Sequence, residues 1–178
     1  EVWKHCGMDL KNVEFVWVSD MVKDPGYWKT VMQVAINSTV KRIVRCSQIM
    51  GRNESDALSA SQILYPCMQA ADIFYLGVDI AQLGMDQRKV NVFAREIADK
   101  FRWQKPVAVH HHMLMGLDGP VSGGPEGMGI EGDSISKAIA MKMSKSKPDS
   151  AIFMTDSKEE VERKIKKAYC PEKIVEGN

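Results

Sequence analysis

The sequence predicts an α/β fold in which helices flank a parallel sheet. Three neighbouring segments carry this prediction: residues 78–83 are predicted as a short strand, residues 88–100 as a helix with one apolar face, and residues 106–111 as a second strand. A strand, a helix and a strand in this order form the βαβ unit of a parallel sheet. The turn at residues 84–87 joins the first strand to the helix.

The segment before this unit is predicted to be mainly helical. Residues 13–20 alternate apolar and mixed side chains, which predicts a strand that ends in a Ser-Asp turn. Apolar residues three and four positions apart predict helices at residues 27–37 and 40–50, with the second ending at Gly51. A longer helix is predicted at residues 59–76.

This longer helix contains Pro66 and is followed by Gly77, so we expect a kink inside it and an end at the glycine. Another helix is predicted at residues 157–168. Asp156 is expected to be its N-cap, with Glu159 completing a capping box.

The composition is that of an ordinary globular domain. The chain has 178 residues, 44% of them hydrophobic and 26% charged, which suits one core and excludes a disordered or fibrous chain. With 24 Lys and Arg against 23 Asp and Glu, the net charge is +1. Such a charge excludes a large basic field that would by itself bind nucleic acid or membranes, but it leaves a local basic face open.

The chain has no apolar run long enough to span a membrane and no apolar secretory segment at its start. We therefore expect a cytoplasmic protein with no membrane partner. Because the first residue is Glu1 rather than Met, we also expect the chain to be a piece of something longer. The four cysteines lie far apart with no Cys-x-x-Cys pair, which predicts reduced, mostly buried thiols rather than disulfides or a zinc site.

Tyr65, Gln69 and Asp72 lie on one face of the helix at residues 59–76. At about 100° per residue, spacings of four and three place the phenol, the amide and the carboxylate in one narrow sector. One interpretation is a solvated polar face. The surrounding residues make the helix apolar nearly all round, however, and buried polar groups need partners, so a small polar pocket is the alternative.

Two further groups of residues follow the predicted strands. In parallel sheets ligands bind beyond the carboxyl ends of strands, where Gly84 and Asp86 lie; the alternative is a simple turn with Asp86 as an N-cap. Met113 and Leu114 come after the second strand, so a cleft shared with this turn is expected. Residues 110–112 are three histidines, but neighbouring strand residues point to opposite faces, and no metal site is expected.

Residues 116–136 contain seven glycines and two prolines and predict a mobile loop. Shortly after it, residues 142–146 read Lys-Met-Ser-Lys-Ser. Two ammonium groups and two hydroxyls on a loop could close on a polyphosphate. The alternative is an ordinary exposed loop.

Together these segments resemble a class I aminoacyl-tRNA synthetase, and more narrowly the archaeal and eukaryotic type of tyrosyl-tRNA synthetase. Residues 142–146 are similar to the second signature loop of that class, and residues 168–171 (Ala-Tyr-Cys-Pro) to a segment behind it. Residues 65–74 and 84–91 resemble the tyrosine pocket. The resemblance implies a Rossmann-like catalytic domain that activates L-tyrosine with ATP and transfers it to tRNA(Tyr).

The resemblance also implies a role for each site residue. Asp72 would accept the phenol of the substrate, and Tyr65, Gln69 and Gln87 would hold its amino and carboxylate groups. For ATP, the resemblance implies that Gly84 lies beside the adenylate and that Asp86 binds the ribose. The backbone of Met113 and Leu114 would contact the adenine. The phosphates would be bound by Lys142, Ser144 and Lys145. Lys142 and Lys145 would be the catalytic pair, Mg²⁺ would arrive with ATP, and Arg88 and Lys89 would contact tRNA.

The first signature of the class, His-x-Gly-His, is absent from these 178 residues. We therefore interpret residues 1–178 as part of a catalytic domain, with residues 27–51 as the connecting insertion that forms the interface of a homodimer. Residues 116–136 are longer than expected before the signature loop. Two alternatives stay open: a tryptophanyl-tRNA synthetase, which usually lacks the carboxylate at Asp72, and a noncatalytic synthetase-like chain that binds tRNA or protein.

We expect the 178-residue chain by itself to show no tyrosine activation, because the signature that helps to clasp the ATP triphosphate is absent from it. The measurement is tyrosine-dependent exchange of pyrophosphate into ATP by the purified chain, with the complete protein that includes it as the active control. Exchange by the chain alone would contradict this expectation.

Overall fold

A computed structural model describes residues 2–46, 57–119 and 141–170 of the chain. The chain divides into two units, Glu1–His111 and His112–Asn178, and each is treated separately. In the first unit the described helices and strands are, in chain order, α1 (Val2–His5), the 3₁₀ helix η1 (Leu10–Asn12), α2 (Val18–Met21), α3 (Pro25–Ile36), α4 (Val40–Val44), α5 (Ala60–Tyr75), β1 (Ile80–Gly84), the 3₁₀ helix η3 (Met85–Gln87), α6 (Arg88–Phe101) and β2 (Val107–His111). The second unit contains the 3₁₀ helix η4 (Pro148–Ser150) and α9 (Lys158–Lys167).

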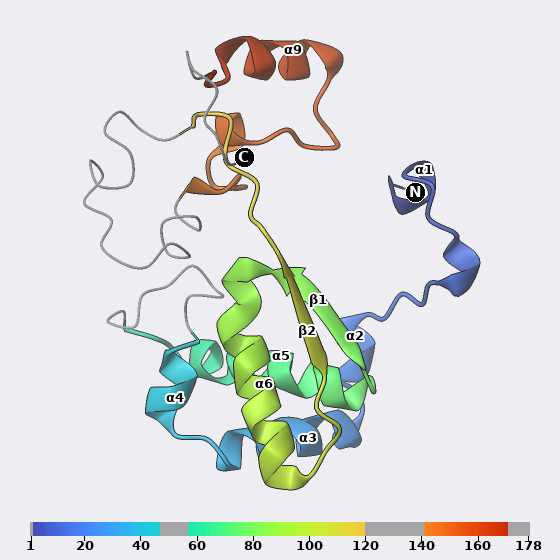
Figure 1. Cartoon of the computed structure of the whole chain (residues 1–178), viewed down its shortest axis with the longest axis vertical. Coiled ribbons are helices and arrows are strands. Elements are labelled where there is room, and N and C mark those ends of the chain that lie inside the picture. The colour runs from blue at the N-terminus through green and yellow to red at the C-terminus, as the bar shows by residue number, and fades with distance from the viewer. Residues whose placement is uncertain (1, 47–56, 120–140, 171–178) are drawn as a thin grey trace. The chain divides into compact units, whose positions relative to one another are not determined.

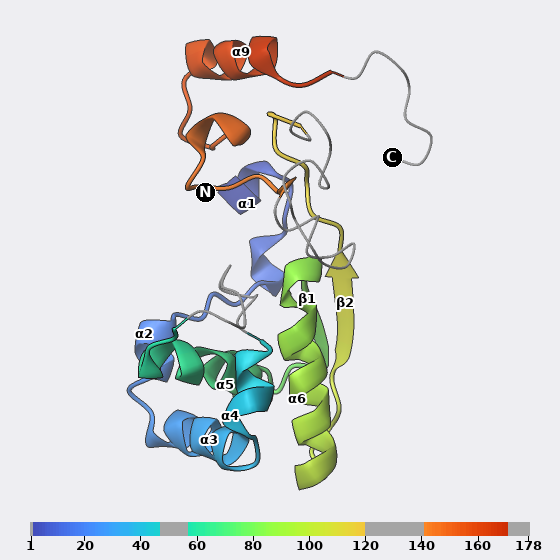
Figure 2. The ribbon, with the colours of Figure 1, turned by 90° about the vertical axis from the view of Figure 1, so that its left-hand side faces the viewer.

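The predicted parallel sheet is confirmed by β1 and β2. The two strands pair in parallel from Ile80 opposite Val107 to Gly84 opposite His111. Helix α6 makes the crossover between them and packs on the pair, while α3, α4 and α5 lie beside α6 (Figures 1 and 2). The carboxyl ends of both strands therefore lie side by side at one edge of the sheet.

Helix α5 is the central helix of the first unit. Ser59 caps it by accepting a hydrogen bond from the Gln62 N–H, while the Gln62 side chain accepts from the Ser59 N–H. Gly77 follows its end with a positive φ of 64°, a conformation that suits glycine. The predicted helix with Pro66 inside it is thus confirmed, and its kink stays a prediction.

The core of the first unit is formed by the facing sides of α3, α5 and α6. Among its members are Tyr27, Val31 and Val34 of α3, Cys67, Ala70 and Ala71 of α5, and Val90, Phe93 and Ala94 of α6, all of them at most 1% exposed. The helix predicted at residues 27–37 begins two residues earlier, because Asp24 caps it and Pro25 takes its first position. The helix predicted at residues 40–50 begins as predicted but ends at Val44, where α4 stops and Arg45 takes the C-cap position. Residues 47–50 and the predicted end at Gly51 lie outside the described residues.

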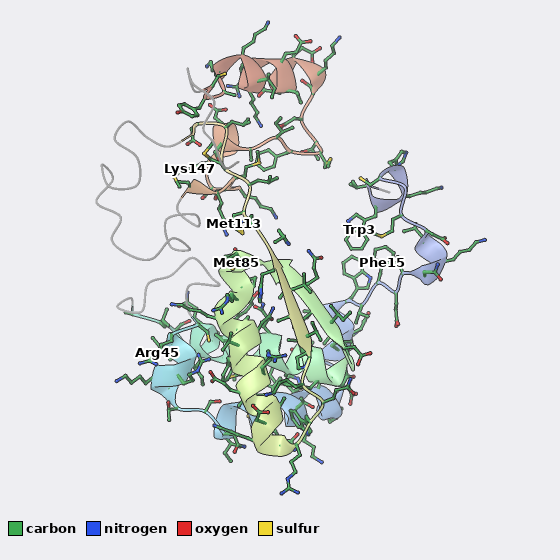
Figure 3. The ribbon with its side chains drawn as sticks, in the orientation of Figure 1. Trp3, Phe15, Arg45, Met85, Met113 and Lys147 are labelled. Atoms are coloured by element: carbon green, nitrogen blue, oxygen red, sulfur yellow. The ribbon has the colours of Figure 1, made fainter. Side chains whose placement is uncertain are left out.

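The strand predicted at residues 13–20 is wrong. Residues 13–17 are irregular and lead into the short helix α2. Their alternating pattern finds no partner, since the only strand pairing among the described residues joins β1 to β2. Phe15 instead stacks on Trp3 with ring centroids 5.0 Å apart (Figure 3).

Two of the four cysteines, Cys46 and Cys67, are buried, whereas Cys6 and Cys170 are exposed. The prediction of mostly buried thiols is therefore correct for only half of them. Burial raises the pKa of the Cys67 thiol to about 11, which keeps it protonated at neutral pH. Within the described residues, none of the helices has the length and apolar character that crossing a membrane requires.

In the second unit, α9 is held to the preceding segment by a buried lysine. The side chain of Lys164 is 3% exposed, and its Nζ donates to the Ala151 carbonyl at 2.9 Å and to Asp156 Oδ2 at 2.6 Å. Asp156 is therefore not the N-cap that the sequence predicts. Ser157 caps the helix by accepting from the Glu160 N–H, and Asp156 accepts from the Phe153 N–H instead.

We expect the substitution Lys164→Met to destabilise the complete protein, because it leaves the Asp156 carboxylate without its cation. The hydrogen bond from Lys164 lowers the pKa of Asp156 below its ordinary value of 3.8. The stabilisation that this ion pair gives the folded state is therefore full above pH 3.8, and it is lost as the pH falls through the lowered pKa. Thermal unfolding should show a drop in melting temperature at neutral pH that shrinks in acid. Lys166→Met, on the exposed side of the same helix, is the control, and an equal drop for both variants would contradict the prediction.

Candidate functional site

A cavity of about 640 Å³ opens beside α5 in the first unit. It brings together the four residues that the sequence analysis assigns to a tyrosine pocket, namely Tyr65, Gln69, Asp72 and Gln87. The first three project from α5 on one side, as their spacing predicts, and Gln87 comes from the turn after β1. The other described lining residues are Val18, Tyr27, Met68, Ile73, Leu76, Val78, Ala81, Gln82 and Leu83.

Asp72 is the acidic group among the described residues that line this cavity. Its Oδ1 accepts a hydrogen bond from the Tyr27 hydroxyl at 2.9 Å. Burial raises the pKa of Asp72, and the hydrogen bond from Tyr27 works in the opposite direction. Burial, followed by the contact with Asp72, in turn raises the pKa of Tyr27 well above its ordinary range, so Tyr27 remains a donor at neutral pH.

The contact of Tyr27 with Asp72 is not predicted from the sequence, where Tyr27 begins the helix at residues 27–37 and belongs to the interface segment 27–51. A signal for its burial was present, because Tyr27, Val31 and Val34 share the helical spacing of an apolar face. A phenol on a buried face needs a partner, but the sequence does not show that the partner is Asp72.

Gln69 links α5 to the turn after β1. Its Nε2 donates to Gln87 Oε1 at 2.9 Å, so the two amides line the cavity as one unit. Gln82 of β1, which also lines the cavity, forms a hydrogen bond of 2.9 Å with Nδ1 of His111. The cavity wall thus combines a carboxylate, two phenols and three amides on a largely apolar frame.

The turn at residues 84–87 lies at the carboxyl end of β1, as predicted. Asp86 is buried at 8% exposure inside the 3₁₀ helix η3, and the N-cap position of α6 belongs to Gln87. The alternative that made Asp86 the helix cap is therefore wrong, because the extra 3₁₀ turn moves the start of α6. Arg88 and Lys89 form the first turn of α6, with Arg88 exposed and Lys89 half-buried.

The histidines at the end of β2 have separate partners. Nε2 of His110 lies 3.0 Å from Nδ2 of Asn91, which is 1% exposed, while His111 pairs with Gln82. Burial, followed by the charge of Arg88, lowers the pKa of His110 and keeps it neutral at neutral pH. Among the residues with described placement, no three histidines, cysteines or acidic residues come together in a way that could hold a metal ion.

In the second unit, residues 142–146 lie directly beside the segment that contains Met113 and Leu114. Lys142 pairs with Met115 in an antiparallel bridge, and the Met143 N–H donates to the Leu114 carbonyl at 3.1 Å. Figure 3 shows Met113 on this segment and Lys147 on the loop that follows the signature residues. The predicted adenine segment and the predicted phosphate loop are therefore joined by backbone hydrogen bonds.

The signature loop is closed by Ser150, a residue that the sequence analysis did not single out. Ser150 is 3% exposed; its Oγ accepts from the Ser144 N–H at 3.2 Å and donates to the Lys147 carbonyl at 2.7 Å. Lys145 lies at the exposed tip of this turn, and Lys142 at its half-buried start. The turn thus presents ammonium and hydroxyl groups from a backbone that the Ser150 side chain holds in place.

The model of the family described as "tRNA synthetases class I (W and Y)" matches residues 1–123 and 133–176. The chain belongs to this family. The α/β fold with a Rossmann-like parallel sheet is thereby confirmed, since the solved structures that it resembles are class I synthetases.

Within the family the likeness is to tyrosyl members. The cytoplasmic tyrosine–tRNA ligase 1 of Arabidopsis thaliana is 54% identical over the whole chain, which covers 42% of that protein. The tyrosyl-tRNA synthetase of Pyrococcus horikoshii, solved with L-tyrosine, has a TM-score of 0.80 and 45% identity over 94% of this chain and 47% of the other. The chain therefore spans less than half the length of these two relatives. The predicted resemblance to tyrosyl-tRNA synthetases is confirmed.

A tryptophanyl-tRNA synthetase from Aeropyrum pernix is more distant. It shares 24% identity with the chain at a TM-score of 0.65, over 91% of this chain and 39% of the other. A likeness at that level of identity shows a common class I synthetase fold. It gives the tryptophanyl alternative no further support.

Proposed function

We propose that this class I synthetase chain carries the amino-acid pocket and the signature loop of a tyrosine–tRNA ligase. The observation that supports the proposal best is Asp72, a half-buried carboxylate in a mainly apolar cavity of about 640 Å³. A phenol entering this cavity can donate to the carboxylate while its ring contacts the apolar wall. The relative from Pyrococcus horikoshii, which binds L-tyrosine, supports the same substrate.

The other polar lining residues suit the opposite end of the amino acid. Tyr65, Gln69 and Gln87 supply a hydroxyl and two amides, which can donate to a carboxylate and accept from an ammonium group. The hydrogen bond between Gln69 and Gln87 fixes the amides in advance. In this proposal Asp72 selects the side chain, and these three residues orient the reacting carboxylate.

The reaction then needs no nucleophile from the protein. The tyrosine carboxylate attacks the α-phosphorus of ATP, the bond to the β-phosphate oxygen breaks, and pyrophosphate leaves. Lys142 and Lys145 stabilise the negative charge that builds on the leaving group, and Ser144 binds a phosphate oxygen. Catalysis comes from orientation and electrostatic stabilisation. A hydroxyl of the terminal ribose of tRNA(Tyr) then attacks the tyrosyl carbonyl, the bond to the phosphate of the adenylate breaks, and AMP leaves.

The remaining ATP contacts are assigned to Gly84 and Asp86 at the end of β1 and to Met113 and Leu114 in the second unit. Because the Leu114 carbonyl accepts from Met143, binding of adenine by this segment would also position the signature loop. The donors of that loop are ammonium and hydroxyl groups, which suit phosphate oxygens rather than a cation. We therefore place Mg²⁺ on the phosphates of ATP.

We also propose a homodimer and a tRNA contact. Met32 and Ile36 on α3 and Val40 on α4 are 50%, 84% and 62% exposed, and such apolar side chains on the segment 27–51 suit contact with a second copy. Arg88 and Lys89 would contact the acceptor end of the tRNA. The relative from Arabidopsis thaliana supports a cytoplasmic location.

The substitution Asp72→Ala tests which residue recognises the substrate phenol. Loss of a hydrogen bond to a charged acceptor costs about 1.5 to 3 kcal/mol, so kcat/KM for L-tyrosine should fall roughly 10- to 100-fold in the complete protein. L-phenylalanine should lose far less, because it forms no hydrogen bond with the carboxylate in the unmodified protein. Tyrosyl-tRNA synthetase is itself the standard example of such selection by an unpaired polar group. The measurement is amino-acid-dependent pyrophosphate exchange.

The control for this experiment is Asp99→Ala, which removes an exposed carboxylate on α6. An unchanged ratio of tyrosine to phenylalanine in the Asp72 variant would show that another group recognises the phenol. Absence of tyrosine-dependent exchange in the unmodified complete protein would contradict the proposed function and would favour the noncatalytic alternative.

Alanine at Lys142 or Lys145 should slow adenylate formation by roughly tenfold to thousandfold, the range seen when one charge-stabilising donor is removed. The affinity for tyrosine should change little, because these lysines act on the phosphates. Single-turnover formation of tyrosyl-adenylate in the complete protein measures both quantities. Lys147→Ala, an exposed lysine in the same turn, is the matched control. Weaker tyrosine binding at an unchanged rate would show that the role is misassigned.

A further inference from the structure

Tyr27 reaches the tyrosine cavity from a different helix than the other predicted pocket residues. It belongs to α3, is completely buried, and donates to Asp72 Oδ1 at 2.9 Å across 45 positions of sequence. Its ring is held edge-on by Trp28, with centroids 5.7 Å apart, and by Tyr75, with centroids 5.3 Å apart. The phenol is therefore fixed in one place before any ligand arrives.

The contact with Tyr27 occupies one of the two oxygens of the Asp72 carboxylate. Among the described residues, Tyr27 is the only one whose side chain donates to Asp72. A carboxylate has two oxygens with several lone pairs. With Oδ1 taken by a rigid donor, rotation of the carboxylate is restricted and Oδ2 is left for a ligand in the cavity.

The contact also favours the ionised form of Asp72. Burial raises the pKa of Asp72, and the Tyr27 hydrogen bond offsets part of that rise. The titratable side chains among the described lining residues are Tyr27 on α3, Tyr65 on α5 and Asp72 itself. The described side chains of α4 and α6, which also pack on α5, supply none of the effects that shift the pKa of Asp72. Tyr27 is thus the group that favours the ionised form of Asp72, the form that accepts a hydrogen bond from a ligand.

We propose that Tyr27 is a positioning residue for substrate selection, whose phenol holds one oxygen of Asp72 so that the other receives the phenol of tyrosine. The inference rests on the proposed function and adds a residue that acts through Asp72. In the bound state, one carboxylate would accept from two phenols, one of the protein and one of the substrate.

The test is Tyr27→Phe in the complete protein, because phenylalanine keeps the buried ring and removes only the donor. We expect kcat/KM for L-tyrosine to fall roughly tenfold, because the substrate's own hydrogen bond to the charged Asp72 is weakened when Oδ1 is no longer held. L-phenylalanine, which makes no bond to Asp72, should change little, so the ratio of tyrosine to phenylalanine also falls roughly tenfold. KM for ATP should stay the same.

The matched control is Tyr75→Phe. It removes a phenol from the neighbouring ring, whose hydroxyl donates to Asp24 at 2.6 Å outside the cavity lining. The ratio of tyrosine to phenylalanine should be unchanged in this variant. An equal change in both variants would show a general packing effect and would overturn the proposal.

The pH dependence gives a readout that a merely structural role would not move. Tyrosine binding needs ionised Asp72, so affinity is present above its pKa and is lost as the pH falls through it. Removal of Tyr27 removes an effect that lowers this pKa, and the acid limb of 1/KM for tyrosine should therefore move to higher pH in Tyr27→Phe. An acid limb at the same pH would overturn the proposal.

A double-mutant cycle keeps the test decisive if the single variant is unstable. In an Asp72→Asn background, Tyr27→Phe should have no further effect on the ratio, because Tyr27 acts through the carboxylate. Full additivity of the two changes would overturn the inference. Failure of the proposed function is distinguished from both results, since the unmodified protein would then show no tyrosine-dependent exchange at all.

Discussion

The first unit is organised around one carboxylate placed in an apolar helix. Helix α5 buries Cys67, Ala70, Ala71 and Ile73 against its neighbours, and Asp72 stands between the last two. A charge in that position loses hydration, which costs several kcal/mol unless a partner replaces the water. Tyr27 is the partner, and it can fill this role only because α3 packs along α5. Packing of the two helices and chemistry of the cavity therefore depend on the same contact.

Much of the cavity could be predicted from sequence because its residues are local to one helix and one turn. Tyr65, Gln69 and Asp72 share a face of α5 by periodicity alone, and the end of β1 brings in Gln87. Tyr27 could not be predicted in the same way. Its bond to Asp72 joins residues 45 positions apart, and helical spacing shows that the phenol is buried without showing which group it meets.

The errors have equally specific causes. The alternation at residues 13–17 satisfies the pattern of a strand, but a strand also needs a neighbour to pair with, and sequence spacing carries no information about that neighbour. Asp156 has the chemistry of an N-cap, yet Lys164 binds its carboxylate and Ser157 caps the helix instead. Helical periodicity of apolar residues also fails to predict the burial of Lys164. In α9 this charged residue is buried, while Ile165 is 53% exposed. One ion pair, between residues eight positions apart, thus overrides the local preference of both Asp156 and Lys164.

Helix α3 presents two different faces, and this links the two parts of the proposed function. One face carries Tyr27, Val31 and Val34 into the core, and the other exposes Met32 and Ile36. In the proposed homodimer, a second copy would contact the exposed face of the same 12-residue helix that carries the phenol bound to Asp72. Hydrogen bonds weaken steeply with distance and angle, and a small displacement of α3 is therefore enough to change how well Asp72 accepts. In the proposed function, contact between copies and selection of the amino acid would therefore depend on the same helix rather than on separate parts of the chain.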